Sequence, residues 1–204
     1  MNAYQQELEI KLYLSDLPAY QKLLEALGAR LKEPRQHEVN LRFDTTDGAL
    51  TRSAQVLRLR QDTVARLTYK GPGETLNEVH ARKEIEFTVS DYNSARDLLE
   101  ALGYQVSLMY EKYRTTYEID GLQVTLDEMP YGHFTEIEGP EAGGIRSIAD
   151  KLGLDWEARI VDSYTSLFDH LREKLGLTFR DLSFDNFDSM DISPQDLGIK
   201  PADG

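Results

Sequence analysis

Residues 7–14 read ELEIKLYL, and the alternation of polar or charged side chains with apolar ones along this stretch decides the fold. Leu8, Ile10, Leu12 and Leu14 occupy the even positions. A period of two places these side chains on one face of a β-strand, whereas a helix would need a period near 3.6. We therefore predict a strand over 7–14, followed by a helix over 16–28 that ends at Gly28.

The same alternation returns in seven further stretches, which we predict to be strands. They cover residues 38–43, 57–60, 66–70, 82–89, 107–118, 122–127 and 133–138. Further helices are expected over 90–102, 141–152 and 158–175. Most neighbouring strands are joined by connections too short for a crossover helix, so the chain is predicted to be an α+β protein built on an antiparallel sheet.

The length of 204 residues and the hydrophobic content of 40% are sufficient for one substantial core. We predict a single folded domain over residues 1–175. The segment over 176–204 is acidic, rich in turn-forming residues and without sustained periodicity. We expect it to be an extension that wraps the surface or is partly disordered.

The formal net charge of −13 argues against proteins that coat nucleic acid or an anionic membrane, because both need a basic face. No stretch is apolar over the length that spans a bilayer, and the first residues lack the pattern of a signal peptide. We therefore expect a cytoplasmic protein with a small-molecule ligand. The chain has no cysteine, so any metal must bind to oxygen or imidazole ligands.

The polar faces of the predicted strands carry nearly equal numbers of acids and bases. The acids are Glu7, Glu9, Glu84, Glu86, Asp127, Glu136 and Glu138, and the bases are Lys11, Arg58, Arg60, Lys70, Arg82, Lys112 and Arg114. An antiparallel sheet commonly has one solvated face, and for any single strand that interpretation is the more economical one.

The set as a whole favours a binding site. Charges of the same sign two residues apart, as in Glu136 and Glu138, lie within about 7 Å and repel each other. A bound ion of opposite charge would offset the repulsion. Paired carboxylates suit Mg²⁺ or Mn²⁺, while rows of Arg and Lys suit phosphate oxygens, so a charged lumen would fit a metal-phosphate ligand.

The order of these residues resembles the CYTH superfamily, the triphosphate tunnel metalloenzymes. ELEIK at 7–11 is similar to the ExExK motif of that family, and FDT at 43–45 resembles its FDT segment. LRLR at 57–60, TYKGP at 68–72 and RKEIE at 82–86 follow in the family order. Lys112, Arg114, Asp127 and the EIE at 136–138 complete the pattern, which spans about residues 4–170. Lys83 departs from it, because relatives commonly carry an acid at that position, but its side chain is expected to point outward.

The resemblance implies an eight-stranded antiparallel β-barrel that forms a charged tunnel, with helices packed outside. It implies that a catalytic Mg²⁺ or Mn²⁺ is bound by Glu7, Glu9, Asp127, Glu136 and Glu138. It also implies that the phosphate chain is held by Lys11, Arg58, Arg60, Lys70, Arg82, Lys112 and Arg114. Lys11, Arg60, Lys70 and Glu84 are expected to act in catalysis itself.

The resemblance implies metal-dependent hydrolysis of inorganic triphosphate or a small organic triphosphate. A class IV adenylyl cyclase, which converts ATP to cyclic AMP and pyrophosphate, is the first alternative, since both reactions need the same phosphate clamp. A binder of polyphosphate or nucleotides without catalysis is the second. A homodimer is left open by the sequence.

Overall fold

The computed structural model describes the backbone of residues 6–76 and 79–204, and the side chains of residues 8–74 and 81–204. Eight antiparallel strands close into a barrel in the order β1-β5-β4-β3-β2-β6-β7-β8. They are β1 (Gln6–Leu14), β2 (Arg30–Asp44), β3 (Val56–Gln61), β4 (Ala65–Leu76), β5 (Val79–Val89), β6 (Gln105–Ile119), β7 (Leu122–Met129) and β8 (Gly132–Gly139). The predicted α+β class and the eight-stranded barrel are confirmed.

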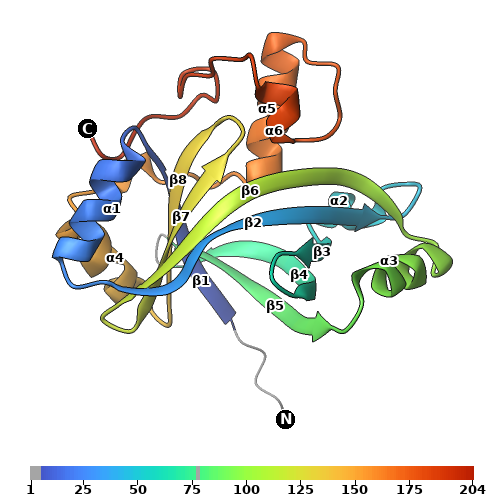
Figure 1. Cartoon of the computed structure of the whole chain (residues 1–204), viewed down its shortest axis with the longest axis horizontal. Coiled ribbons are helices and arrows are strands. Elements are labelled where there is room, and N and C mark those ends of the chain that lie inside the picture. The colour runs from blue at the N-terminus through green and yellow to red at the C-terminus, as the bar shows by residue number, and fades with distance from the viewer. Residues whose placement is uncertain (1–5, 77–78) are drawn as a thin grey trace.

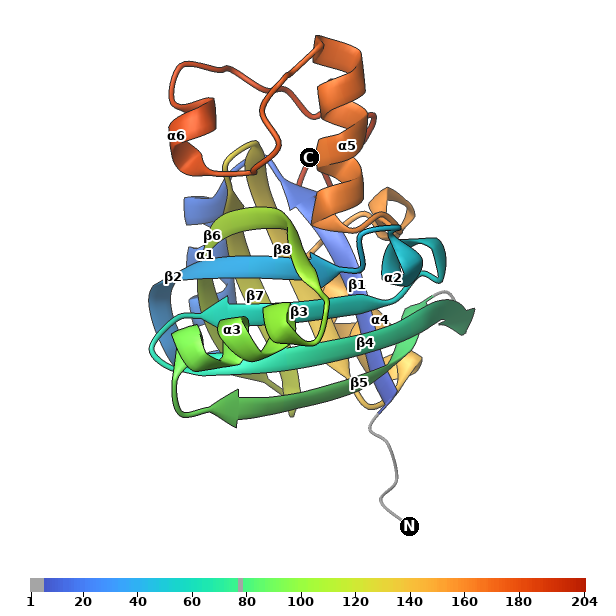
Figure 2. The same ribbon diagram turned by 90° about the vertical axis from the view of Figure 1, so that its right-hand side faces the viewer.

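The helices lie outside the barrel (Figure 1). They are α1 (Leu17–Ala26), α2 (Ala49–Arg52), α3 (Tyr92–Ala101), α4 (Ala142–Lys151), the 3₁₀ turn η1 (Trp156–Ala158), α5 (Tyr164–Leu175) and α6 (Phe184–Phe187). Figure 2 shows α3 against the wall formed by β3, β4 and β5, with α5 and α6 above the barrel. In the part of the chain that is described, no helix has the length and apolarity needed to cross a bilayer.

Two elements differ from the sequence prediction. The helix expected over 158–175 begins only at Tyr164, because η1 ends at Ala158 and the side chain of Ser163 caps α5 by accepting a hydrogen bond from the Ser166 amide. The strand expected over 38–43 begins at Arg30. Its first half contains Pro34 and shifts in register against β6, so it lacks the alternation that marks a regular strand.

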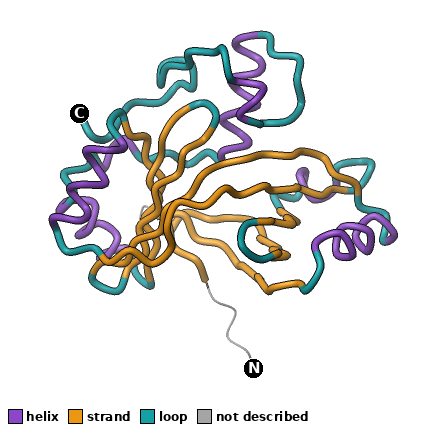
Figure 3. The backbone as a smooth tube through the Cα atoms, in the orientation of Figure 1, coloured by secondary structure: helices purple, strands orange, loops and turns teal. Residues whose placement is uncertain are grey.

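Apolar side chains pack in three clusters outside the tunnel. One lies between the barrel and the helices α1 and α4 and includes Trp156, which is 5% exposed. A second joins the ends of β7 and β8 to α5 and the C-terminal residues. The third lies under α3. The barrel wall is therefore held by packing from outside, which leaves its inner face available to polar side chains. Figure 3 shows the helices placed around the outside of the strands.

Candidate active site in the barrel interior

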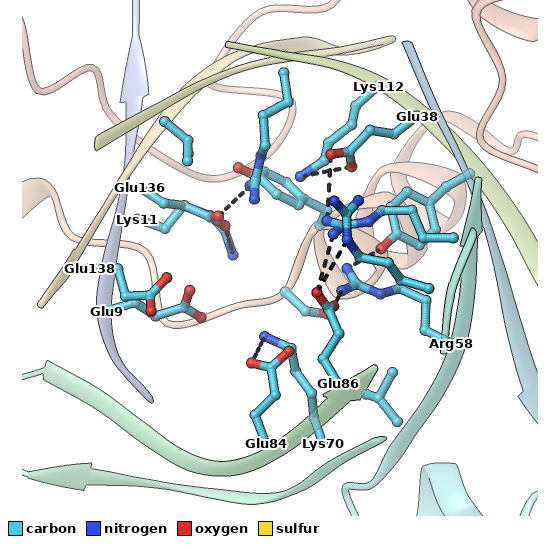
Figure 4. A pocket seen from close by; sticks show the side chains of 18 of the residues that line it. Glu9, Lys11, Glu38, Arg58, Lys70, Glu84, Glu86, Lys112, Glu136 and Glu138 are labelled. Carbon is cyan, nitrogen blue, oxygen red and sulfur yellow. Dashed lines mark hydrogen bonds and ion pairs between the residues drawn. The ribbon is translucent and has the colours of Figure 1, made fainter. Parts of the chain in front are cut away.

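Charged side chains converge on one cavity of about 490 Å³ inside the barrel (Figure 4). Its lining includes nine basic side chains, Lys11, Arg42, Arg58, Arg60, Arg66, Lys70, Arg82, Lys112 and Arg114. It also includes seven carboxylates, Glu9, Glu33, Glu38, Glu84, Glu86, Glu136 and Glu138. Among the described residues, nine bases and seven acids line the cavity, and the carboxylates of Asp127 and Asp62 pair with some of these bases from behind. The cavity thus gathers many bases inside a chain whose net charge is −13.

The strand period explains this convergence. On β3, Arg58 and Arg60 line the cavity, whereas the alternate residue Leu59 is fully buried in the apolar cluster under α3. β1 follows the same rule, with Glu9 and Lys11 facing the cavity and Ile10 packed outside. All predicted phosphate-binding residues share this cavity, which is the arrangement expected of a tunnel rather than of a solvated sheet surface.

Arg58 and Arg60 form a network with Glu86 on one wall. Their Nη2 atoms lie 3.4 Å from Glu86 Oε2 and Oε1, respectively. Arg60 Nη1 also lies 3.5 Å from Glu38 Oε1. Burial alone raises the pKa of Glu86, but Arg60, the Thr68 hydroxyl and Arg58 lower that pKa overall. The carboxylate therefore stays ionised and holds both guanidinium groups in the lumen.

A second network centres on Asp127, which has no exposed surface. Its oxygens accept hydrogen bonds from Lys112 Nζ at 3.1 Å, from Arg114 Nε at 2.6 Å and Nη2, and from the Tyr164 hydroxyl at 2.8 Å. Burial opposes ionisation of Asp127, but Arg114 and Lys112 lower its pKa overall. Arg114 also donates to Glu136 at 2.5 Å, and Lys11 Nζ lies 3.7 Å from Glu136 on its other side.

The remaining predicted residues occupy the wall formed by β4 and β5. Lys70 Nζ lies 2.9 Å from Glu84 Oε2, and these residues face each other in the strand register. Arg82 Nη2 donates to the Gly71 carbonyl at 3.1 Å. All three side chains line the cavity. Lys83 alternates with them and is exposed on the outside of β5, as expected.

Two of the predicted metal ligands lie together. Glu9 on β1 faces Glu138 on β8 in the strand register, and Figure 4 shows their carboxylates side by side at the cavity wall. No group of three or more candidate ligands is placed to hold a metal among the described residues. Mg²⁺ is commonly held by one or two carboxylates together with substrate phosphates and water, so this pair fits a substrate-assisted site. The predicted ligand Glu7 has its backbone in β1, but its side chain lies outside the described residues.

Sequence reasoning missed several residues that line the cavity. Glu38 and Arg42 alternate with apolar residues in the predicted strand at 38–43, so the period of two already placed them beside the site. Ser163, Tyr164 and Thr165 also line it. They lie at the N-terminus of α5, and no local pattern indicated that this helix end would face the lumen.

Comparisons with known proteins agree with this geometry. The sequence pattern of the CYTH domain family matches residues 5–149. A protein of Methanocaldococcus jannaschii described as a candidate adenylate cyclase is 27% identical over 135 residues, which are 65% of this chain and 75% of that protein. The adenylate cyclase CyaB of Aeromonas hydrophila is 29% identical over 135 residues, 64% of this chain and 67% of CyaB.

Solved structures share the fold. A candidate adenylate cyclase from Vibrio parahaemolyticus has a TM-score of 0.72 at 20% identity, covering 82% of this chain and 99% of that one. HpAC1 from Hippeastrum, a candidate adenylyl cyclase described as having a dominant triphosphatase activity, has a TM-score of 0.62 at 23% identity. That match covers 80% of this chain and 95% of HpAC1.

Proposed function

This chain belongs to the CYTH domain family, and from that premise we propose that it hydrolyses a linear triphosphate with Mg²⁺ or Mn²⁺. The observation that carries the proposal is the convergence of nine Lys and Arg side chains on one cavity of a strongly acidic protein. A triphosphate chain carries several negative charges over a short length. It therefore matches a lumen lined by converging Lys and Arg side chains better than a neutral or cationic ligand does.

In the proposed reaction, a water oxygen attacks the terminal phosphorus and the bond to the bridging oxygen breaks, which gives phosphate and a diphosphate product. The basic side chains stabilise the charge on the equatorial and leaving oxygens. Arg58 and Arg60 bind from β3, held by Glu86, while Lys112 and Arg114 bind from β6, two strands away in the barrel, held by Asp127. Lys11 on β1 and Lys70 on β4 are proposed to contact the phosphate chain from the other side of the cavity.

The metal role remains a proposal for Glu9, Glu136, Glu138, Asp127 and Glu7. A bound Mg²⁺ or Mn²⁺ would polarise phosphoryl oxygens and acidify a water molecule. Glu9 and Glu138 are the pair best placed for it, because they face each other in the strand register and both line the cavity. Glu84, beside Lys70, is proposed to orient that lysine and the attacking water.

An adenylyl cyclase is the second candidate. A side pocket of about 250 Å³ shares Glu9, Lys11 and Arg82 with the main cavity and is lined in part by Ala54, Gly73, Ile160 and Val161. An apolar recess beside the phosphate-binding groups is a place where a nucleobase could pack. The relatives named as adenylate cyclases support this candidate, and the triphosphatase activity of HpAC1 supports hydrolysis.

A product assay separates these reactions. Purified protein with Mg²⁺ or Mn²⁺ is offered inorganic triphosphate, thiamine triphosphate and ATP, while phosphate, pyrophosphate and cyclic AMP are measured. Phosphate release from a triphosphate supports the proposal, and cyclic AMP with pyrophosphate from ATP supports the cyclase. Glu9→Gln, compared with the control Glu100→Gln on the exposed face of α3, tests whether any turnover belongs to the tunnel. Tight triphosphate binding without a product would overturn both reactions in favour of a binding protein.

A further inference from the structure

The N-terminus of α5 forms part of the cavity wall. Ser163, Tyr164 and Thr165 line the cavity, and the Tyr164 ring lies 4.3 Å from Lys11 Nζ. The Thr165 hydroxyl accepts a hydrogen bond from Arg42 at 2.5 Å, and the Asp162 carbonyl accepts one from Lys11 at 3.1 Å. These contacts join α5 to bases from two different strands.

Tyr164 reaches the second charged network through Asp127. Its hydroxyl donates to Asp127 Oδ2 at 2.8 Å, the same oxygen that accepts from Lys112 Nζ at 3.1 Å. Because this carboxylate also binds Arg114, its position sets the position of two basic groups of the cavity. Tyr164 is therefore placed to orient Lys112 and Arg114 indirectly.

One turn further along α5, the same buried face packs on the C-terminal extension over residues 176–204. Phe168, which is fully buried, stacks on Phe179 with ring centroids 5.9 Å apart and lies 6.0 Å from Phe187. Phe187 in turn lies 6.3 Å from Tyr131, whose hydroxyl donates to the Tyr164 carbonyl at 2.7 Å. A buried path of side chains thus leads from the extension to the residue that holds Asp127.

The extension is fixed to the barrel at two separate places. β7 pairs with β6 only along residues 113–119, so the preceding residues of β6 are left for the extension. There Leu182 pairs with Tyr110. The Leu182 N–H donates to the Met109 carbonyl, and the Leu182 carbonyl accepts from the Glu111 N–H, both at 2.9 Å. Near the C-terminus, the Ala202 amide donates to the Tyr13 carbonyl at 2.9 Å. The Asp203 carboxylate accepts from the Ser15 and Asp16 amides. Figure 1 shows the extension passing over the barrel between these places.

This part of the chain lies beyond the matched family pattern. The CYTH domain match ends at residue 149, and the Vibrio and Hippeastrum structures are covered over 95% or more of their length by only 80–82% of this chain. The extension therefore lies outside the family match, yet its aromatic residues contact the helix that borders the tunnel.

We propose that the C-terminal extension is a brace that fixes the N-terminus of α5 in the tunnel wall, with Tyr164 as the positioning residue for the Asp127, Lys112 and Arg114 network. The catalytic part of this inference rests on the proposed triphosphate hydrolysis. The brace itself is a structural relationship that holds for any ligand of the cavity. Its consequence is that substitutions in the extension, whose residues do not line the cavity themselves, alter turnover.

Two comparisons test the brace. Phe187→Ala removes a side chain that is 4% exposed from the extension, and Ile148→Ala removes one that is 2% exposed from the cluster beneath α4. Both variants are expected to lower the thermal midpoint, because each leaves a core cavity. Only Phe187→Ala is expected to increase amide hydrogen exchange over residues 163–168 and to reduce kcat for inorganic triphosphate, by about 10- to 100-fold.

Tyr164→Phe isolates the positioning step. The ring beneath Lys11 remains, while the hydrogen bond to Asp127 is lost. We expect kcat to fall by about tenfold, with a change in KM of less than about threefold, because the displaced bases act mainly on the transition state. Phe187→Leu, which retains a buried apolar side chain, should recover most of the kcat lost in Phe187→Ala. If the alanine protein does not fold, Phe179→Ala, which removes the ring stacked on Phe168, is the test variant.

The outcomes separate the brace from the proposed reaction. If the wild-type protein does not hydrolyse any triphosphate, the proposed function fails. The brace can still be tested, because amide hydrogen exchange over residues 163–168 can be compared between the variants and the wild type without any turnover. The brace is overturned if the folded alanine variant of Phe187, or of Phe179 in its place, shows wild-type exchange there, or if Ile148→Ala reduces kcat as much as that variant does. Wild-type kcat in Tyr164→Phe overturns the positioning role.

Discussion

Glu9 on β1 faces Glu138 on β8 in the strand register, so two carboxylates share one wall of the tunnel. Like charges placed opposite each other on neighbouring strands repel, and such a pair is destabilising unless a cation or a proton lies nearby. The pair is thus suited to bind a divalent cation together with phosphate oxygens.

The first prediction follows from this pair. Glu9→Gln removes one negative ligand with little change in shape, so turnover at limiting Mg²⁺ should fall by about two orders of magnitude or more while the barrel stays folded. Steady-state rates across a range of Mg²⁺ concentrations, with circular dichroism for folding, provide the measurement. Glu100→Gln, on the exposed face of α3, should behave as the wild type. Wild-type turnover of Glu9→Gln at limiting Mg²⁺ would contradict the metal assignment.

The second prediction concerns Arg60, whose guanidinium lies between Glu38 and Glu86. Loss of one charge-assisted phosphate contact in a poorly hydrated site should cost roughly 2 to 4 kcal/mol of transition-state stabilisation, about 30- to 1,000-fold in kcat/KM. Arg60→Lys should recover only part of this, because the charge remains while the bidentate geometry is lost. Kinetics of Arg60→Ala and Arg60→Lys on the best substrate measure the effect.

The control for Arg60 is Arg30→Ala, since Arg30 is exposed and pairs with Glu118 outside the tunnel. Its kcat/KM should match the wild type. Arg60→Ala within a few-fold of the wild type would show that Arg60 is not part of the phosphate clamp. A lysine variant as impaired as the alanine variant would mean that geometry matters more than charge.

The third prediction concerns acid stability and Asp44, which is 4% exposed in the FDT segment. Burial alone raises its pKa, but hydrogen bonds from the Thr51 hydroxyl and from the Leu50, Thr51 and Thr45 amides lower the pKa to about 2. An unfolded aspartate titrates near 3.9, so the ionised form adds stability above about pH 4 and loses it as the pH falls toward 2. The contribution is about 2 kcal/mol at neutral pH.

Asp44→Asn should therefore lower the free energy of unfolding most at neutral pH, and the difference from the wild type should shrink between pH 4 and pH 2. Urea unfolding at several pH values measures it. Asp97→Asn, on the exposed face of α3, is the control and should show a small difference at every pH. A difference between Asp44→Asn and the wild type that stays constant from pH 7 to pH 2 would rule out the ionised Asp44 as its source.

The fourth prediction concerns metal removal. Several cavity carboxylates already pair with Lys or Arg, as Glu84 does with Lys70 and Glu136 with Arg114. We therefore expect a chelator to abolish turnover while the thermal midpoint changes little. Inorganic triphosphate should raise the midpoint even without metal, because it binds the folded lumen and not the unfolded chain. Unfolding at ordinary temperature after chelation would show that the ion is structural instead.

The alternation of residues alone determined which strands form and which side chains face inward. A period of two is a local property, so Glu9, Lys11, Arg58 and Arg60 could be assigned to one face from their immediate neighbours. The motif order then indicated the family, which the match over residues 5–149 confirms. The short helices α2 and α6 could not be predicted, because four residues are too few for helical periodicity.

Only the tertiary structure decided which inward-facing charged side chains pair with each other and which distant segments of the chain pack against the barrel. Tyr164 and Asp127 are 37 residues apart, and Ala202 bonds the barrel at Tyr13, so neither contact leaves a mark in the local pattern. Likewise, the alternation of β3 placed Arg60 in the lumen, but the closure of the barrel brought it to Glu38 and Glu86. Local periodicity fixes the direction of a side chain, whereas its partners depend on how distant strands and segments pack together.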